Sequence, residues 1–374
     1  MIHVIPDIFR SAGAFAFVLG VLIFVHEFGH YLAARWCGVH VEVFSIGFGK
    51  AITSWMDRRG TRWAIAWLPL GGYVRMHGQE RPEDVSAQVR ASWIPGRTFN
   101  DKKVWQRAII VAAGPVANFL LAMVLFGAVF ASMGEPVALP ATLPVVGGVL
   151  PDSAAAHAGL RTNDRIDSVA GQPVHNFADI QHIIEPRPGQ TMPITITRGG
   201  LTETVQVHTG SQMSDGKRIG LLGIRSGAVE YRHLPLGLAL WAGVQQTWTV
   251  TAETVHGIGQ MISGARGTQD LGGPLRIAEL SGQVAELGLT SLVSFIAVLS
   301  INLGLINLFP IPILDGGYLL FYLAEAVRGR PLPPRALEYG FRAGLAVLAT
   351  LFLFVTWNDL TNIGLFHWVA HLMG

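Results

Sequence analysis

Long apolar segments separated by polar stretches dominate the pattern of this chain. The four longest segments cover residues 8–36, 105–133, 290–310 and 341–366. A helix crosses the hydrocarbon core of a bilayer with about 20 apolar residues, so each segment is long enough to span. The last segment is interrupted by the polar residues Asn358 and Asp359. The pattern predicts an α-helical polytopic membrane protein with about four transmembrane helices.

The stretch between the first two segments is rich in Arg and Gly and is too polar to cross a membrane. Within it, residues 63–74 read Trp-Ala-Ile-Ala-Trp-Leu-Pro-Leu-Gly-Gly-Tyr-Val. Aromatic and β-branched residues around Pro and Gly-Gly favour strands and a turn over a helix. We therefore expect strands and a turn that contain residues 63–74, as in a membrane-associated β-hairpin. Backbone at membrane depth must be shielded by protein or line a cavity.

Residues 139–209 have the pattern of a water-soluble domain. Short β-type runs at residues 192–197 and 204–207 lie among glycine turns and polar loops. We expect a domain of about 70 residues inserted into the membrane core. The predicted boundaries are residues 1–138 and 289–374 for the two parts of the membrane core, 139–212 for the soluble domain and 213–288 for a connector.

Residues 234–262, within this connector, predict an amphipathic helix. Trp241, Val244, Trp248 and Val255 recur at helical spacing. Four polar residues interrupt the apolar run: Gln245, Gln246, Glu253 and His256. We expect this helix to lie on a membrane surface or to pack against the soluble domain, rather than to form a fifth span.

Composition supports a membrane protein. Hydrophobic residues make up 50% of the chain and charged residues 14%, whereas soluble domains carry roughly 25% charged residues. The net charge of +2 is too small to indicate a nucleic-acid partner. The single cysteine, Cys37, excludes an intramolecular disulfide and a cysteine-rich zinc site. Arg10 is the only Lys or Arg before the uninterrupted apolar run of residues 12–25, and no small-residue cleavage site follows that run, so we expect a retained helix rather than a signal peptide.

Basic residues predict the topology. Residues 35–107 hold twelve Lys or Arg, and four more arginines follow the third apolar segment. By the positive-inside rule, both regions are expected on the cytoplasmic side. Residues 134–288 hold ten Lys or Arg, but the rule applies only weakly to long translocated domains. The soluble domain is therefore expected outside the membrane.

A metal-binding signature follows the first apolar run. Residues 26–30 read His-Glu-Phe-Gly-His. On a helix, His26 and His30 share one face, so both imidazoles can reach one metal ion. Glu27 beside them can act as a base toward water. Three ionisable residues in a spanning segment are costly, which indicates a function. The alternative is a structural histidine pair whose ring nitrogens form hydrogen bonds with the neighbouring backbone of a helix bundle.

A third ligand is expected after the third apolar segment, because catalytic zinc sites use three protein ligands. Residues 307–317 read Asn-Leu-Phe-Pro-Ile-Pro-Ile-Leu-Asp-Gly-Gly. The prolines end or unwind the helix, and the glycines allow close backbone approach. Asp315 then lies at about the membrane depth expected for His26 and His30. The alternative is a helix-end turn with a solvated Asp.

Together, these two motifs resemble the site-2 protease family of intramembrane zinc metalloproteases. Residues 44–50, 68–76 and 113–118 resemble the bacterial regulator of sigma-E protease (RseP) group. Residues 146–149 with 158–166 resemble a bacterial PDZ domain, and Gly147 and Gly148 there are expected to adopt backbone that only glycine favours. That group usually carries two PDZ domains, whereas this chain has room for one.

The resemblance implies roles for five residues. Zinc is expected on His26, His30 and Asp315, with Glu27 as general base. Asn307 is expected to position the substrate or to stabilise the oxyanion. The implied activity is cleavage of transmembrane segments in single-span membrane proteins, such as anti-sigma factors or signal-peptide remnants, after they are shortened outside. The implied location is the bacterial cytoplasmic (inner) membrane, with the PDZ domain periplasmic and acting as a docking element or size filter.

Two other function classes remain as alternatives. One is a PDZ-bearing membrane scaffold or chaperone with an inactive protease core, which should have lost Glu27 or a ligand. The other is a metal or ion transporter, because intramembrane His and Asp also mark ion paths. Transporters more often repeat their motifs in two halves, and no such repeat is present. The substrate, the cleaved bond and the oligomeric state stay open.

Overall fold

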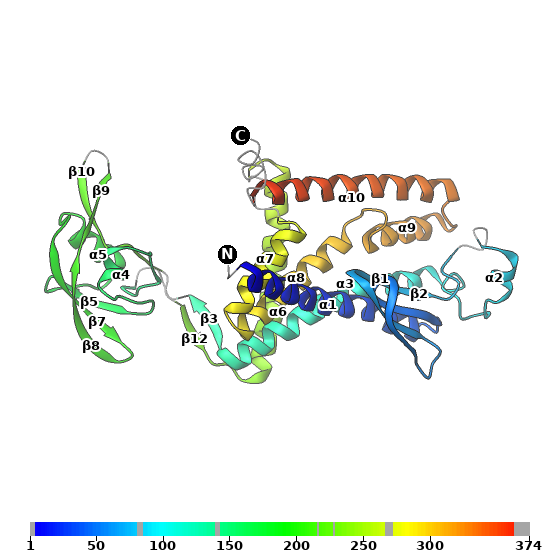
Figure 1. Cartoon of the computed structure of the whole chain (residues 1–374), viewed down its shortest axis with the longest axis horizontal. Coiled ribbons are helices and arrows are strands. Elements are labelled where there is room, and N and C mark those ends of the chain that lie inside the picture. Colours follow the sequence, from blue (N-terminus) through cyan, green and yellow to red (C-terminus); the bar gives the residue numbers. More distant parts are fainter. Residues whose placement is uncertain are drawn as a thin grey trace. The chain divides into compact units, whose positions relative to one another are not determined.

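The computed structural model describes residues 4–80, 85–138, 143–214, 217–226, 229–265 and 272–362. The chain divides into two compact units. We call Met1–Val129 together with Leu236–Gly374 the membrane unit, and Phe130–Pro235 the inserted unit. Figure 1 shows the chain coloured along its sequence, with most of the inserted unit in green.

Four described helices are long and apolar enough to cross a membrane. They are α1 (Val4–Trp36), α3 (Val104–Met133), α8 (Leu289–Leu308) and α10 (Pro334–Asn362). With a rise of about 1.5 Å per residue, even the shortest of these helices spans roughly the 30 Å hydrocarbon core. The four predicted spans are confirmed, although residues 363–366 of the last predicted segment lie outside the described residues.

Three further helices of ten residues or more belong to the membrane unit: α6 (Leu236–Ile262), α7 (Pro274–Glu286) and α9 (Asp315–Arg328). Helix α6 covers the predicted amphipathic segment and contacts α8. Its Gly243 lies directly on the backbone of Met123 and Gly127 in α3. Small residues therefore let this helix pack closely on transmembrane helices of the membrane unit.

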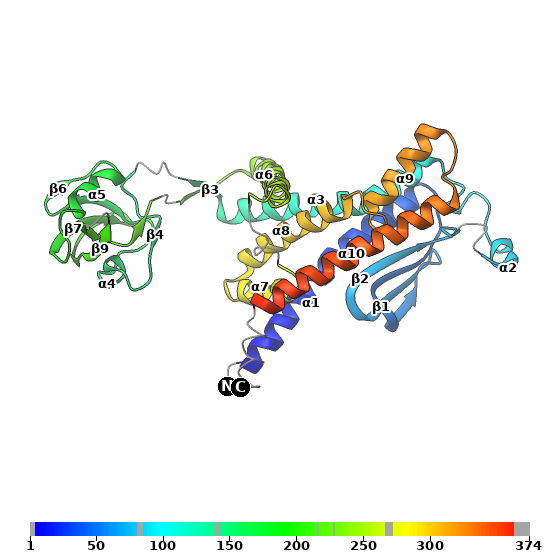
Figure 2. The ribbon, with the colours of Figure 1, turned by 90° about the horizontal axis from the view of Figure 1, so that it is seen from above.

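Helix α7 lies against α1 and α10, as both views show (Figures 1 and 2). Asp359 of α10 caps its N-terminus, because its carboxylate accepts hydrogen bonds from the backbone N–H groups of Gly273 at 2.8 Å and Arg276 at 3.3 Å. A carboxylate at a helix N-terminus accepts hydrogen bonds from backbone N–H groups that have no partner within the helix, and its negative charge interacts favourably with the helix dipole. The polar interruption in the fourth apolar segment is thus a contact between helices.

The membrane unit also holds a curled antiparallel sheet and a short helix, α2 (Ala87–Ala91). The sheet is built from β1 (Val41–Met56) and β2 (Arg62–Met76). Residues 62–76 do not form the predicted hairpin with each other. Phe44 of β1 pairs with Trp63 on one side and with Val74 on the other. Each long strand folds back on itself, and Gly47, with φ of 91°, provides one of these bends.

This pairing sets the order of the sheet. Residues 51–56 pair with 62–66, which pair with 43–46, which pair in turn with 72–76. Residues 72–76 therefore form an edge. The face toward α1 is aromatic, with Phe44 and Trp63 rings 4.4 Å apart and Tyr31 of α1 5.3 Å from Trp63. This cluster fixes the sheet against the first span.

The inserted unit is rich in strands. Its central antiparallel sheet has the order β6 (Gln172–Pro173), β5 (Arg165–Val169), β7 (Thr191–Arg198), β8 (Leu201–His208). The other pairs are β3 (Glu135–Ala138) with β12 (Val229–Arg232), β4 (Gly148–Val149) with β11 (Ile224–Arg225), and β9 (Gly210–Ser214) with β10 (Lys217–Leu221). Two short helices complete it, α4 (Ala154–His157) and α5 (Phe177–Ile184).

The core of the inserted unit follows the alternation of β7. Met192, Ile194 and Ile196 are buried on one face, as expected for a half-buried strand. The predicted β-type runs fall inside β7 and β8. The unit extends beyond residues 139–212 because β3 and β12 pair outside them. The four domain ranges drawn from the sequence stay predictions.

Candidate metal centre

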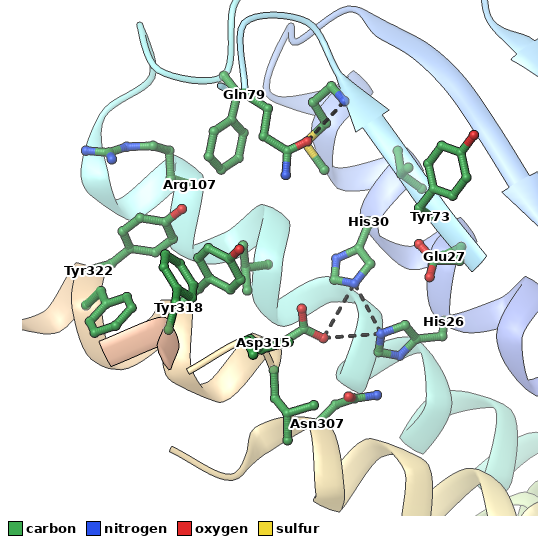
Figure 3. A pocket seen from close by; sticks show the side chains of 18 of the residues that line it. His26, Glu27, His30, Tyr73, Gln79, Arg107, Asn307, Asp315, Tyr318 and Tyr322 are labelled. Carbon is green, nitrogen blue, oxygen red and sulfur yellow. Dashed lines mark hydrogen bonds and ion pairs between the residues drawn. The ribbon is translucent and has the colours of Figure 1, made fainter. Parts of the chain in front are cut away.

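Two imidazoles and one carboxylate converge in the membrane unit (Figure 3). His26 and His30 lie on one face of α1, both only 8% exposed, with their Nε2 atoms 3.2 Å apart. Asp315 is the first residue of α9. Its Oδ2 atom lies 3.2 Å from His26 Nε2 and 3.5 Å from His30 Nε2. Among the described residues, this is the one His/Cys/Asp/Glu group with the spacing of a metal site.

These distances fit a tetrahedral zinc ion. Bonds of about 2.0–2.1 Å at tetrahedral angles place ligand atoms roughly 3.3 Å from one another. The three observed separations are 3.2, 3.2 and 3.5 Å. Asp315 Oδ2 is also a buried oxygen without a hydrogen bond among the described residues. Two imidazoles and a carboxylate are a common catalytic zinc set that leaves one position open.

Helix α3 orients the histidines. The Nδ1–H of His30 donates to the carbonyl of Ile110 at 2.9 Å, which leaves Nε2 free to face Asp315. Gly114 lies against both imidazole rings, and a Cβ there would overlap His30. Gly29 of α1 is equally close to the backbone of Ala113. Gly29 and Gly114 therefore let α1 and α3 approach closely enough to hold the rings.

A tight turn presents Asp315. Helix α8 ends at Leu308, and a Cβ on Gly316 would overlap the Leu308 carbonyl. Gly344 of α10 lies equally close to the carbonyl of Pro312. Ile313 has φ of 98°, which is strained for a β-branched residue. The chain thus folds back sharply to point the carboxylate at α1.

Glu27 and Asn307 line the same cavity as the three candidate ligands. Its volume is about 1030 Å³. Glu27 lies beside His26, close to Tyr73 of the edge strand, and Asn307 is on the last turn of α8 (Figure 3). Gly72 approaches Glu27 so closely that a Cβ would be 2.9 Å from Glu27 Cγ. The structure brings all five predicted site residues to one cavity.

Four further residues at or near this site were not singled out from the sequence. Asn118 of α3 lies 3.2 Å from His26 Nδ1. Arg107 pairs with Glu325 at 2.6 Å on the wall of the same cavity. The Arg107 guanidinium also lies 5.0 Å from the ring centre of Tyr322. Asn118 carried a usable signal, because it is the only polar side chain between residues 108 and 131.

Comparison with known proteins identifies the family. Residues 14–351 match Peptidase family M50. A Rhizobium meliloti relative named as a zinc metalloprotease is 41% identical over 362 residues, covering 92% of this chain and 95% of the relative. The metalloprotease MmpA of Caulobacter vibrioides is 35% identical, covering 95% of this chain and 96% of the relative.

Among solved structures, the PDZ domain of the SdrC-like protein of Listeria monocytogenes is similar to part of the chain. The match has 21% identity and a TM-score of 0.20, and it covers 24% of this chain and 90% of that one. The family model and the two relatives cover nearly the whole length of the chain. The chain belongs to peptidase family M50, the site-2 protease family of membrane zinc metalloproteases.

Proposed function

We propose that this protein is an intramembrane endopeptidase that cleaves transmembrane segments of single-span membrane proteins. The observation that carries the proposal is the convergence of His26, His30 and Asp315 between helices long and apolar enough to span. A site at that depth faces peptide bonds that soluble proteases do not reach. Glu27, on the wall of the same cavity, supplies the base that such a reaction needs.

In the proposed reaction, the two histidine Nε2 atoms and the Asp315 carboxylate would hold the metal. Zinc, when bound there, supplies Lewis acidity that polarises the scissile carbonyl and lowers the pKa of a water molecule. Glu27 takes the proton of the attacking water and delivers it to the leaving nitrogen as the C–N bond breaks. The Asn307 amide donates a hydrogen bond to the oxygen that becomes negative.

The edge strand supports a docking mode for the substrate. Residues 72–76 end the sheet, and Gly72 and Tyr73 line the cavity beside Glu27. A helical substrate shields its carbonyls with its own hydrogen bonds, so it must unwind before cleavage. An extended segment added to this edge would gain backbone hydrogen bonds as the helical ones are lost. Residues 72–76 are therefore the proposed docking edge for an unwound substrate segment.

The location is part of the proposal. We place the protein in the bacterial cytoplasmic membrane, with the metal centre toward the cytoplasm and the inserted unit outside. The twelve basic residues between residues 35 and 107 support this orientation. The inserted unit then acts as a size filter, admitting substrates whose outer domain has been removed by an earlier cleavage.

Cells carrying two versions of a single-span model substrate test this function. One version keeps its outer domain, and the other lacks it. The intact enzyme should cleave mainly the shortened version, and Glu27→Gln should cleave neither. Glu253→Gln is a matched control, because Glu253 is exposed on α6. Equal cleavage of both versions would refute the size filter, and cleavage by Glu27→Gln would refute the protease assignment.

A further inference from the structure

Asn118 is a fully buried amide beside a candidate ligand. It lies on α3 with 0% of its surface exposed. Its side-chain Nδ2 is 3.2 Å from His26 Nδ1, on the side of the ring opposite the Nε2 that faces Asp315. Its Oδ1 is buried and has no hydrogen-bond partner among the described residues. A buried acceptor without a donor is costly and calls for an explanation.

The chemistry of a metal-binding imidazole provides that explanation. A neutral histidine that binds a metal through Nε2 carries its proton on Nδ1. The Nδ1–H of His26 then needs an acceptor, whereas the amide nitrogen of Asn118 offers only donors. The two ends of a carboxamide are nearly equal in size, so the amide can present either end to the ring. Presenting Oδ1 gives the unpaired oxygen a donor and the imidazole N–H an acceptor.

We propose that Asn118 is a positioning residue whose Oδ1 accepts the Nδ1–H of His26 and so holds Nε2 toward the metal. The inference rests on the metal-binding role of His26 proposed above. The Ile110 carbonyl makes the equivalent contact with His30 at 2.9 Å. Helix α3 thus orients both histidines of α1, one through its backbone and the other through a side chain.

The surroundings hold Asn118 in place for this role. Ser300 of α8 donates a hydrogen bond to the Asn118 backbone carbonyl at 2.8 Å. Gly114, one turn earlier on α3, lies against the edge of the His26 ring. Acceptors behind metal-bound histidines fix the tautomer and the ring orientation, and losing them typically lowers metal affinity 10–100-fold. Asn118 is placed to contribute an effect of this size.

Zinc affinity of the purified full chain tests the proposal, measured by competition with a chromophoric chelator. Asn118→Leu keeps the approximate size and removes the acceptor, so zinc binding should weaken about 10–100-fold. Asn118→Asp keeps an oxygen acceptor and should bind zinc within about threefold of the parent, or more tightly. Glu253→Gln, at an exposed position on α6, is the control, and its zinc affinity should be unchanged.

Unchanged zinc affinity in folded Asn118→Leu would overturn the proposal. If that variant does not elute as folded protein, Asn118→Asp decides, and a loss of more than tenfold in its affinity overturns the proposal. His26→Ala separates this inference from the proposed function. Loss of zinc in His26→Ala but not in Asn118→Leu refutes only the role of Asn118. Full affinity in His26→Ala refutes the metal site itself.

Discussion

Arg107 at the start of α3 and Glu325 on α9 form a largely buried ion pair, with Arg107 Nη2 2.6 Å from Glu325 Oε1. The two side chains are 15% and 13% exposed. Helix α9 begins with Asp315, and α3 orients both histidines. The pair therefore links the helix that presents the carboxylate to the helix that fixes the imidazoles, across 218 residues of sequence.

Breaking this ion pair should lower the unfolding free energy of the protein. Glu325→Gln keeps the side-chain size and leaves the Arg107 charge without its partner, so we expect a loss of about 1–3 kcal/mol in unfolding free energy. Arg107→Met should cost a similar amount, and the double variant less than the sum, because neither charge is then stranded. Denaturation in mild detergent measures the unfolding free energies of the parent, the two single variants and the double variant. Strictly additive losses would show that the pair does not couple the helices.

Asp315→Asn should weaken zinc binding, because a neutral amide is a poorer ligand than a carboxylate. The double variant His26→Ala with His30→Ala should lose zinc altogether. Metal analysis of the purified protein checks both, and removal of zinc by a chelator should abolish activity until zinc is returned. Asp359→Asn is the matched control and should keep zinc, because an amide oxygen can still accept a hydrogen bond at the N-terminus of α7. Stoichiometric zinc in the histidine double variant would place the metal elsewhere.

Gly114→Ala should disrupt the centre, because the added methyl overlaps the His30 ring. The expected result is a loss of zinc and activity of at least about tenfold, in line with other perturbations of ligand orientation. Gly20→Ala on α1 is the control, since nothing lies within 4 Å of a Cβ there. It should be neutral or stabilising by up to about 1 kcal/mol, the helix propensity difference. Equal behaviour of the two variants would contradict the packing described for α3.

The inserted unit should lose stability in acid through Asp164. Burial raises the pKa of Asp164, but hydrogen bonds from the Arg198 side chain and the Arg161 backbone outweigh burial and leave the pKa below its ordinary value. A carboxyl with a depressed folded-state pKa stabilises the fold above its unfolded pKa of about 3.9. That contribution is lost as the pH falls through the folded-state value.

Hydrogen exchange of β7 amides in the full chain, corrected for the intrinsic pH dependence, measures this effect. Protection should fall below about pH 4 in the parent. Asp164→Asn should start from lower protection at neutral pH and lose less of it in acid. An unchanged acid response in that variant would mean that other carboxyl groups set the stability of the unit.

Much of the fold was predictable because its signals are local. Length and hydropathy alone predicted the four membrane spans. The short β-type run that contains Met192, Ile194 and Ile196 predicted β7. The five candidate site residues came from two short motifs, and the structure brings them to one cavity. Each of these signals lies within about thirty residues of sequence, where a periodic pattern is informative.

The failures concern contacts between distant segments. The pairing of Phe44 with both Trp63 and Val74 depends on a sheet that folds back twice, and no local pattern encodes it. Helix α9, which begins at Asp315 inside the second motif, was not predicted. The special role expected of Gly148 is wrong, because its φ is not positive and a Cβ there would meet open space.

Mass spectrometry of the products from a purified reaction tests the intramembrane protease most directly. A single-span substrate is incubated in detergent with the zinc-loaded parent and with zinc-loaded Glu27→Gln. The parent should cut within the transmembrane segment. Glu27→Gln should retain stoichiometric zinc and produce at least about 10²-fold less product, since general-base catalysis typically contributes that much. Cleavage only outside the transmembrane segment, or near-normal cleavage by Glu27→Gln, would contradict the proposed function.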